Sequence, residues 1–308
     1  MKAAPDAVLD PAVDAQAHAA APPIRPLYWS VRRELWENRS IYLAPMGVAA
    51  FAVVALVIHV VTMPSHMPGV LANDPAAAGT AGIAYRVGAL LMLATMFVIG
   101  AFYCLEALSS ERRDRSILFW KSLPVSDAAA VLAKASIPLA VLPVVTFAAL
   151  VAMHLVLLLL SSVALLVQGQ SSGPLWGEVQ VLRMWPSLLY AIAALTLWHA
   201  PIHGFLLLVS GWARRTAVLW AVLPLLALGL LEKLTMDTTR VASAVTYRLI
   251  GWYGEAFAAP GAEHIPFTPL TPLTPGRFLA TPGLWIGLAL AAVFLAAAVR
   301  LRRYREPI

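Results

Sequence analysis

Six apolar stretches, most of them long enough to cross a lipid bilayer, restrict the fold of this sequence more than any other feature. They cover residues 43–63, 87–108, 137–167, 188–209, 217–233 and 284–299. A helix needs about 20 apolar residues to cross the hydrocarbon core. Backbone amides in lipid must be paired within the chain, and a helix pairs its own. The sequence therefore predicts an all-α integral membrane protein with about six transmembrane helices.

Composition agrees with this reading. The 308 residues are 60% hydrophobic and 12% charged, whereas soluble globular proteins have about 25% charged residues. No polar linker divides residues 27–308, which we interpret as one transmembrane domain. The third stretch exceeds a perpendicular crossing and predicts a tilted or projecting helix. Residues 1–26, rich in Ala and Pro, predict a disordered cytoplasmic tail without a cleavable signal peptide.

Basic residues alternate between the two sides of the predicted bundle. The segments before the first stretch, between the second and third, between the fourth and fifth, and after the sixth hold 16 Lys and Arg. The remaining segments hold 6. Cytoplasmic segments carry the excess of positive charge, so both termini are predicted to be cytoplasmic. The net charge of +6 reflects this distribution and does not indicate a nucleic-acid partner.

Two connecting segments predict helices at the membrane surface. Residues 27–42 place Leu27, Tyr28, Val31, Leu35 and Tyr42 on one arc and the charged Arg33, Glu34 and Glu37 away from its centre. This pattern favours an interfacial helix over a simple cytoplasmic extension. Residues 238–252 have apolar residues at helical spacing and predict a second surface helix. Three Thr-Pro units in residues 268–275 favour an extended polyproline-like segment.

The connection between the second and third stretches is unusually apolar for a loop. Five large apolar residues, Ile117, Leu118, Phe119, Trp120 and Leu123, follow a charged run that begins at Glu111. An exposed apolar cluster needs lipid or a partner to cover it. Ser126 is a credible N-cap for the next helix, with Asp127 in its first turn. A short helix across the end of the bundle is therefore predicted, and a helix that touches only lipid headgroups is the alternative.

Three parts of the sequence resemble ABC-2 type transporter permeases: residues 109–127, residues 33–39, and residues 210–215 followed by 219–224. The resemblance implies the membrane subunit of an exporter in the bacterial inner membrane. It implies a separate cytoplasmic ABC ATPase and a second permease chain, either a copy or a relative. The sequence has no Gly-x-x-x-x-Gly-Lys-Ser/Thr loop, so the chain itself is expected to be no enzyme, and ATP is expected on the partner.

By the same resemblance, residues 116–123 form a coupling helix that sits in a groove of the ATPase. Phe119 and Trp120 are its natural anchors, because buried aromatic residues dominate such contacts. The expected contact residues are Arg112, Arg113, Arg115, Ile117, Leu118, Phe119, Trp120, Lys121 and Leu123.

Two other functions have some support in the sequence. His199 and His203, four residues apart, could hold a metal in an intramembrane enzyme, but zinc needs a third ligand and residues 188–209 contain no acidic residue. No metal or other cofactor is therefore expected, and hydrogen bonds between helices around Pro201 are favoured. A secondary carrier should show internal duplication, which is not evident. The carboxylate of Glu106, which lies within the second apolar stretch, is expected either to be functional or to be neutralised by Arg112 and Arg113.

Overall fold

The computed structural model describes residues 26–62, 75–114, 125–169, 171–173, 176, 181–213, 216–257 and 273–304. Over these residues the chain is helical, with one isolated β-bridge between Phe257 and Leu273 and no longer strand. Six helices are long and apolar enough to cross a membrane. The predicted all-α class is confirmed, and so is the predicted number of helices that are long and apolar enough to span a membrane. The tail predicted over residues 1–26 lies, except for its last residue, outside the described residues.

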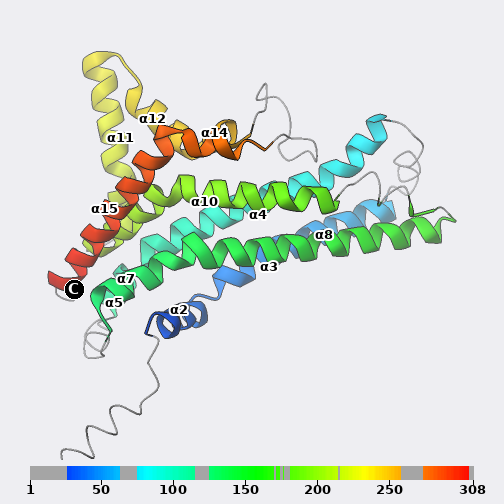
Figure 1. Cartoon of the computed structure of the whole chain (residues 1–308), viewed down its shortest axis with the longest axis horizontal. Coiled ribbons are helices and arrows are strands. Elements are labelled where there is room, and N and C mark those ends of the chain that lie inside the picture. The colour runs from blue at the N-terminus through cyan, green and yellow to red at the C-terminus, as the bar shows by residue number, and fades with distance from the viewer. Residues whose placement is uncertain are drawn as a thin grey trace, which may run out of the picture.

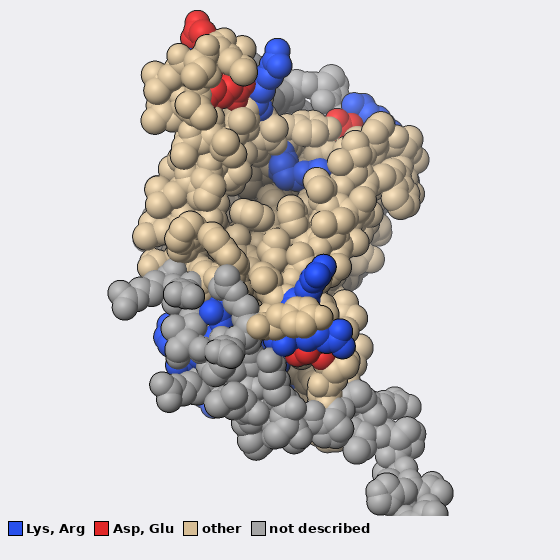
Figure 2. Space-filling model, turned by 90° about the vertical axis from the view of Figure 1, so that its left-hand side faces the viewer, with Lys and Arg blue, Asp and Glu red and all other residues tan. Residues whose placement is uncertain are grey.

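The spanning helices are α3 (Ser40–Thr62), α4 (Pro75–Ala107), α8 (Leu142–Val167), α10 (Val181–Trp212), α11 (Ala217–Met236) and α15 (Pro282–Tyr304). Most of them begin and end close to the predicted limits, but α4 begins at Pro75, well before the predicted residue 87. Figure 1 shows α3, α4, α8 and α10 running side by side, with α15 inclined to them at the left-hand end, where α11 also lies. On the face seen in Figure 2, a broad and mostly uncharged band lies between charged side chains near the top and the bottom. This distribution is typical of a membrane protein.

The third spanning segment is one run of 41 residues, from Asp127 to Val167. It consists of α7 (Asp127–Ser136), a π-helical turn at Ile137–Val141 and α8. Pro138 lies in this turn, where its missing amide cannot close an α-helical hydrogen bond. The predicted N-cap is confirmed, because the Ser126 side chain accepts a hydrogen bond from the Ala129 amide at 3.1 Å. The helix thus begins before the apolar stretch does.

Helix α10 lies at the centre of the molecule and packs against α4, α8 and α15. Its buried residues include Trp198, Leu188 and Leu207. Small residues let its neighbours approach closely: a Cβ atom added at Gly204 would lie 3.2 Å from the Ala291 carbonyl oxygen of α15. Close approach at small residues is a common way for helices to associate in lipid. By contrast, α11 has one buried residue, Ala221, and otherwise exposes apolar side chains.

The segment between α11 and α15 packs on the flank of α10. It contains α12 (Arg240–Ile250), α13 (Trp252–Ala256) and α14 (Pro275–Ala280). The helix predicted within residues 238–252 is confirmed as α12. Trp198 of α10 donates from Nε1 to the Arg248 carbonyl at 3.0 Å, and Arg248 Nη1 donates to the Trp198 carbonyl at 3.2 Å. The predicted polyproline-like segment lies mostly outside the described residues.

The helix predicted over residues 27–42 is shorter than expected. It is α2 (Pro26–Glu37), and Tyr42 already belongs to α3. Val31 and Leu35 contact the core, but Leu27 and Tyr28 are exposed and Glu34 is buried, 2% exposed. Glu34, expected away from the centre of the apolar arc, therefore lies on the buried side of α2 together with Val31 and Leu35. The reason is the ion cluster described below.

Replacing Gly204 with valine tests the close contact of α10 and α15. The added side chain would push against the Ala291 backbone, and we expect the free energy of unfolding to fall by about 1–3 kcal/mol. Gly47→Val is the matched control, because a Cβ atom at Gly47 in α3 has nothing within 4 Å. Thermal unfolding of both variants in one detergent measures the difference. Equal melting temperatures would contradict the packing described.

Candidate functional site

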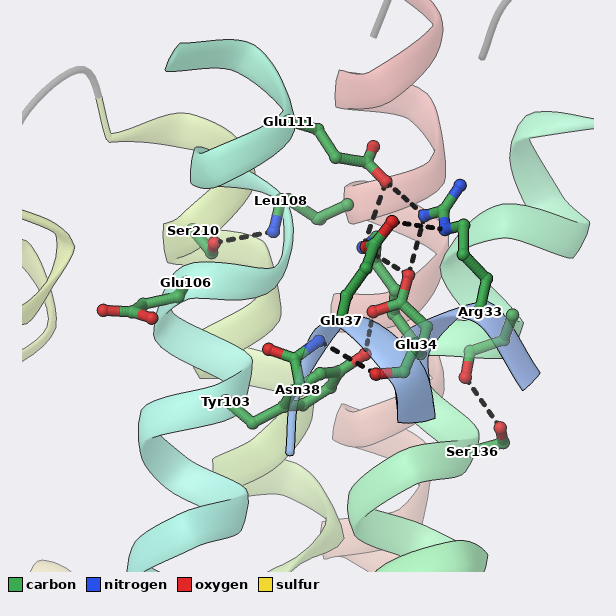
Figure 3. Close-up of polar contacts among 12 residues, drawn as sticks. Arg33, Glu34, Glu37, Asn38, Tyr103, Glu106, Leu108, Glu111, Ser136 and Ser210 are labelled. Carbon is green, nitrogen blue, oxygen red and sulfur yellow. Dashed lines mark hydrogen bonds and ion pairs between the residues drawn. The ribbon is translucent and has the colours of Figure 1, made fainter. Parts of the chain in front are cut away.

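A cluster of buried charges joins four helices at the end of the bundle that carries the C-terminal part of α15. Its central residues are Glu34 of α2, Glu111 of α5 (Ser109–Arg113), Lys134 of α7 and Arg302 of α15, all less than 10% exposed. We call these four residues the ion cluster. Figure 3 shows Glu34 and Glu111 pointing toward each other across the space where the cations bind.

Lys134 holds the two carboxylates together. Its Nζ lies 2.8 Å from Glu34 Oε1 and 3.1 Å from Glu111 Oε1. Arg33 bridges the same two carboxylates from the rim, with Nη2 at 2.8 Å from Glu34 Oε1 and 2.9 Å from Glu111 Oε1. The second oxygen of Glu34 accepts a hydrogen bond from the Tyr103 hydroxyl at 2.7 Å. Each carboxylate therefore has several partners, as buried charges require.

Arg302 connects the two chain segments on either side of residues 115–124. Its Nη1 pairs with Glu111 Oε2, before that segment, and its Nε lies 3.3 Å from Asp127 Oδ1, after it. The end of α15 thus fixes α5 relative to the start of α7.

A second set of contacts ties α5 to the end of α10. Arg112 is 5% exposed, and its Nη1 donates to the Gly211 carbonyl at 2.6 Å and to the Ala213 carbonyl at 3.3 Å. The Ser210 hydroxyl accepts from the amides of Leu108 and Ser109, both at 3.0 Å. These bonds satisfy backbone groups at two helix ends, which would otherwise lack partners.

The surroundings affect the two rim residues Arg33 and Glu37 in different ways, favouring the charged form of Arg33 and disfavouring that of Glu37. Burial by itself lowers the pKa of Arg33, but the carboxylates of Glu34, Glu37 and Glu111 raise this pKa above its ordinary value. Burial raises the pKa of Glu37, and the charge of Arg33 lowers it in part. Neighbouring opposite charges favour each other's ionised form. Arg33 therefore remains a cation at any physiological pH.

The predicted ATPase contacts divide between described and undescribed residues. Arg112 turns inward to α10, whereas Arg113 is exposed beside Asp114, with Nε and Oδ1 3.6 Å apart. The others lie outside the described residues: Arg115, Ile117, Leu118, Phe119, Trp120, Lys121 and Leu123.

Glu106 lies near this end of α4 but outside the cluster. Its side chain is exposed and points away from Glu111 and Glu34 in Figure 3. Among the described residues it forms no ion pair, and Arg112 and Arg113 bind elsewhere. Neutralisation by these two arginines, one of the two predictions for Glu106, is not seen in the structure.

The histidines of α10 contact backbone and aromatic groups. His199 Nδ1 lies 2.8 Å from the Leu195 carbonyl, and its Nε2 lies 3.0 Å from the Leu249 carbonyl of α12, which agrees with the predicted bonding between helices. His203 is buried beside Phe97, with ring centroids 6.1 Å apart. Among the described residues, no three His, Cys, Asp or Glu side chains come together as metal ligands.

Sequence reasoning missed the ion cluster, although a weak signal existed. Glu34 follows the core residue Val31 by three positions and precedes Leu35, so it shares their side of the helix. Lys134 is placed in the same way between Val131 and Ala135, which are buried. A charge at a core position of a helix must find a partner when the helix packs. The identity of that partner is not visible in the sequence.

Comparison of the chain with protein-family models, with curated proteins and with solved structures found no match.

Breaking the ion cluster should destabilise the protein strongly. Lys134→Met removes one of the cations shared by Glu34 and Glu111 and leaves their buried negative charge only partly balanced, and breaking a buried ion pair costs about 3–5 kcal/mol of unfolding free energy. Adding Glu34→Gln to this variant should recover part of the loss, because one carboxylate is then neutral. Thermal or denaturant unfolding in detergent measures both.

Lys233→Met is the control, because Lys233 pairs with Asp237 at the surface of α11, where ion pairs contribute little. Equal losses for Lys134→Met and Lys233→Met would show that the buried cluster does not hold the helices together.

Proposed function

We propose that this chain is the permease subunit of an ATP-driven ABC-2 type transporter, an exporter of the bacterial inner membrane. In this proposal both termini and the ion cluster face the cytoplasm. ATP is hydrolysed by a separate cytoplasmic ABC ATPase, and this chain supplies the membrane pathway and the mechanical connection to it.

The observation that carries the proposal is a meeting of three stretches far apart in the sequence. Residues 33–39, 109–127 and 210–215 are the parts that resemble ABC-2 permeases. In the structure, Arg33 of the first pairs with Glu111 of the second, and Arg112 of the second binds Gly211 of the third. A chance resemblance of three unconnected segments gives no reason for them to be in contact. One shared mechanical function at this end of the bundle gives such a reason.

The proposed coupling step uses residues 115–124, which lie between α5 and α7. Closure of two ATPase subunits around ATP would push this segment. The push would reach α15 and α2 through Arg302 and Lys134, and α10 through Arg112. Buried, many-partnered ion pairs are costly to separate, so the helix ends would move together and the bundle would rock between inward-open and outward-open states.

Within this proposal the contact residues have two tasks. Phe119 and Trp120 anchor the ATPase, with Ile117, Leu118 and Leu123 completing the apolar contact. The exposed Arg113, with Arg115 and Lys121, meets acidic residues at the rim. The buried position of Arg112 is better suited to holding α5 on α10 than to contacting a partner.

A second permease chain completes the proposed transporter. Helices α3 and α11 expose large apolar side chains along most of their length, for example Phe51 and Val54 of α3 and Leu226 and Leu230 of α11. In a membrane such faces contact lipid or another chain, and in the proposed transporter they contact both.

Recovery of the ATPase with the tagged chain tests the proposal. Purified in mild detergent from its native host, the chain should bring down a stoichiometric ABC ATPase. Phe119→Ala and Trp120→Ala should each reduce the recovered ATPase at least about ten-fold, because a buried aromatic anchor typically contributes 2 kcal/mol or more. Quantitative immunoblotting or mass spectrometry of the eluate measures the ratio.

Trp285→Ala is the matched control, since Trp285 is equally large and 59% exposed, but lies at the start of α15, far along that helix from Arg302. It should leave the ratio unchanged. Purification of the wild-type chain without any ATPase would remove the proposed function, and unaffected recovery in both anchor variants would remove the coupling helix.

The proposed orientation can be tested by cysteine labelling. In a Cys104→Ser background, a Phe119→Cys variant in intact cells should resist a membrane-impermeant maleimide and react only after permeabilisation. The native Cys104 is buried, so its replacement removes little reactivity. A cysteine at Thr235, exposed at the far end of α11, should react in intact cells. Labelling of position 119 in intact cells would contradict the proposed topology.

A further inference from the structure

The outward side of α2 carries an arginine between two tryptophans. Trp29, Arg32 and Trp36 are spaced by three and four residues and share one side of the helix. The Arg32 guanidinium carbon lies 5.2 Å from the Trp29 ring centre and 5.1 Å from the Trp36 ring centre, within the range of cation–π attraction. Trp29 is 55% and Trp36 71% exposed, and Arg32 is exposed as well. We call these three residues the Trp–Arg–Trp group.

Arg32 is free for an external ligand in a way that Arg33 is not. Arg33 is bound to the carboxylates of Glu34, Glu37 and Glu111. Among the described residues, Arg32 forms no ion pair, and its guanidinium lies against the two indole rings noted above. Contacts with aromatic faces leave the in-plane N–H donors of a guanidinium available, and two such donors match two oxygens of a phosphate.

The position of α2 indicates that the Trp–Arg–Trp group faces the membrane surface. Helix α3 begins at Ser40, three residues after α2 ends, and is the first spanning helix. The opposite side of α2 is fixed to α7 by the ion cluster, and Figure 1 places α2 on the flank of the bundle below α3. The headgroup layer is about 5–7 Å thick on each side of the hydrocarbon and is the preferred location of Trp side chains. Exposed indoles on a helix at this level belong in that layer.

We propose that the Trp–Arg–Trp group is a headgroup site that binds the phosphodiester of an anionic phospholipid. The indoles lie in the headgroup layer and hold the guanidinium, which donates to two phosphate oxygens. A headgroup without an ammonium group is preferred, because an ammonium would compete with Arg32 for the phosphate. The site needs only that the chain spans a membrane and does not depend on the transport proposal.

Native mass spectrometry of the full chain, released from nanodiscs with equal phosphatidylglycerol and phosphatidylcholine, tests this site. The wild type should retain phosphatidylglycerol in preference. Arg32→Gln should lower the ratio of the two bound lipids about five-fold, the factor that corresponds to about 1 kcal/mol per basic residue at an anionic surface. Arg32→Lys keeps the charge but loses the planar fork, and should lose most of the preference.

Arg240→Gln is the matched control, because it removes one exposed arginine of α12 that lacks flanking indoles, and it should keep the wild-type ratio. Equal ratios for Arg32→Gln and wild type would overturn the site, as would equal loss in Arg240→Gln or full retention in Arg32→Lys. If Arg32→Gln instead reduced recovery of a protein partner with an unchanged lipid ratio, the surface would be a protein contact and the proposal would fail.

Discussion

The arrangement of this end of the molecule depends on the pairing of charges removed from water. Two carboxylates and two cations, each on a different helix, are almost fully buried within one cluster. A single buried charge without a partner is costly, so the four must come together or none can be buried. Helices in lipid gain little from apolar contact with each other, because the tails are as apolar as the side chains. Directed polar contacts therefore decide where α2, α5, α7 and α15 lie.

This pairing also explains the unusual orientation of α2. A helix with aromatic and charged sides at a soluble protein's surface buries its aromatic side. Here Glu34 and Arg33 reach inward to Lys134 and Glu111, so Trp29 and Trp36 point outward. The membrane interface makes this arrangement favourable, since indole rings prefer the headgroup layer to water. One helix thus joins the bundle by its charges and faces the bilayer with its aromatic residues.

The helices differ in how many buried contacts they make with their neighbours, as the proposed movement of the bundle requires. The ion cluster and the Arg112 contacts join helix ends through several buried bonds each, whereas α11 touches its neighbours over a small part of its surface. Between them, α10 carries Pro186 and Pro201, and Pro138 interrupts the α7–α8 run with a π-helical turn. Such interruptions are common sites of bending. In the mechanism we propose, the ATPase pushes on the end of the bundle that holds the ion cluster. The helices then bend at these interruptions.

The amino-acid sequence by itself determined the class of the fold, the six spanning helices and most of their limits. These depend on the length of apolar runs and on local capping, as at Ser126, and both are properties of neighbouring residues. Only the tertiary structure decided which charges are buried, that Arg112 binds α10 and that α2 turns its Glu34 inward. Arg302 looks like an ordinary orienting cation in the sequence, and the core position of Lys134 does not reveal its partners, because the paired residues are up to 191 positions apart. The ion pairs form only when four segments that are distant in the sequence come together. The residues next to each charge therefore do not show which charges will pair, and only the folded bundle brings the partners into contact.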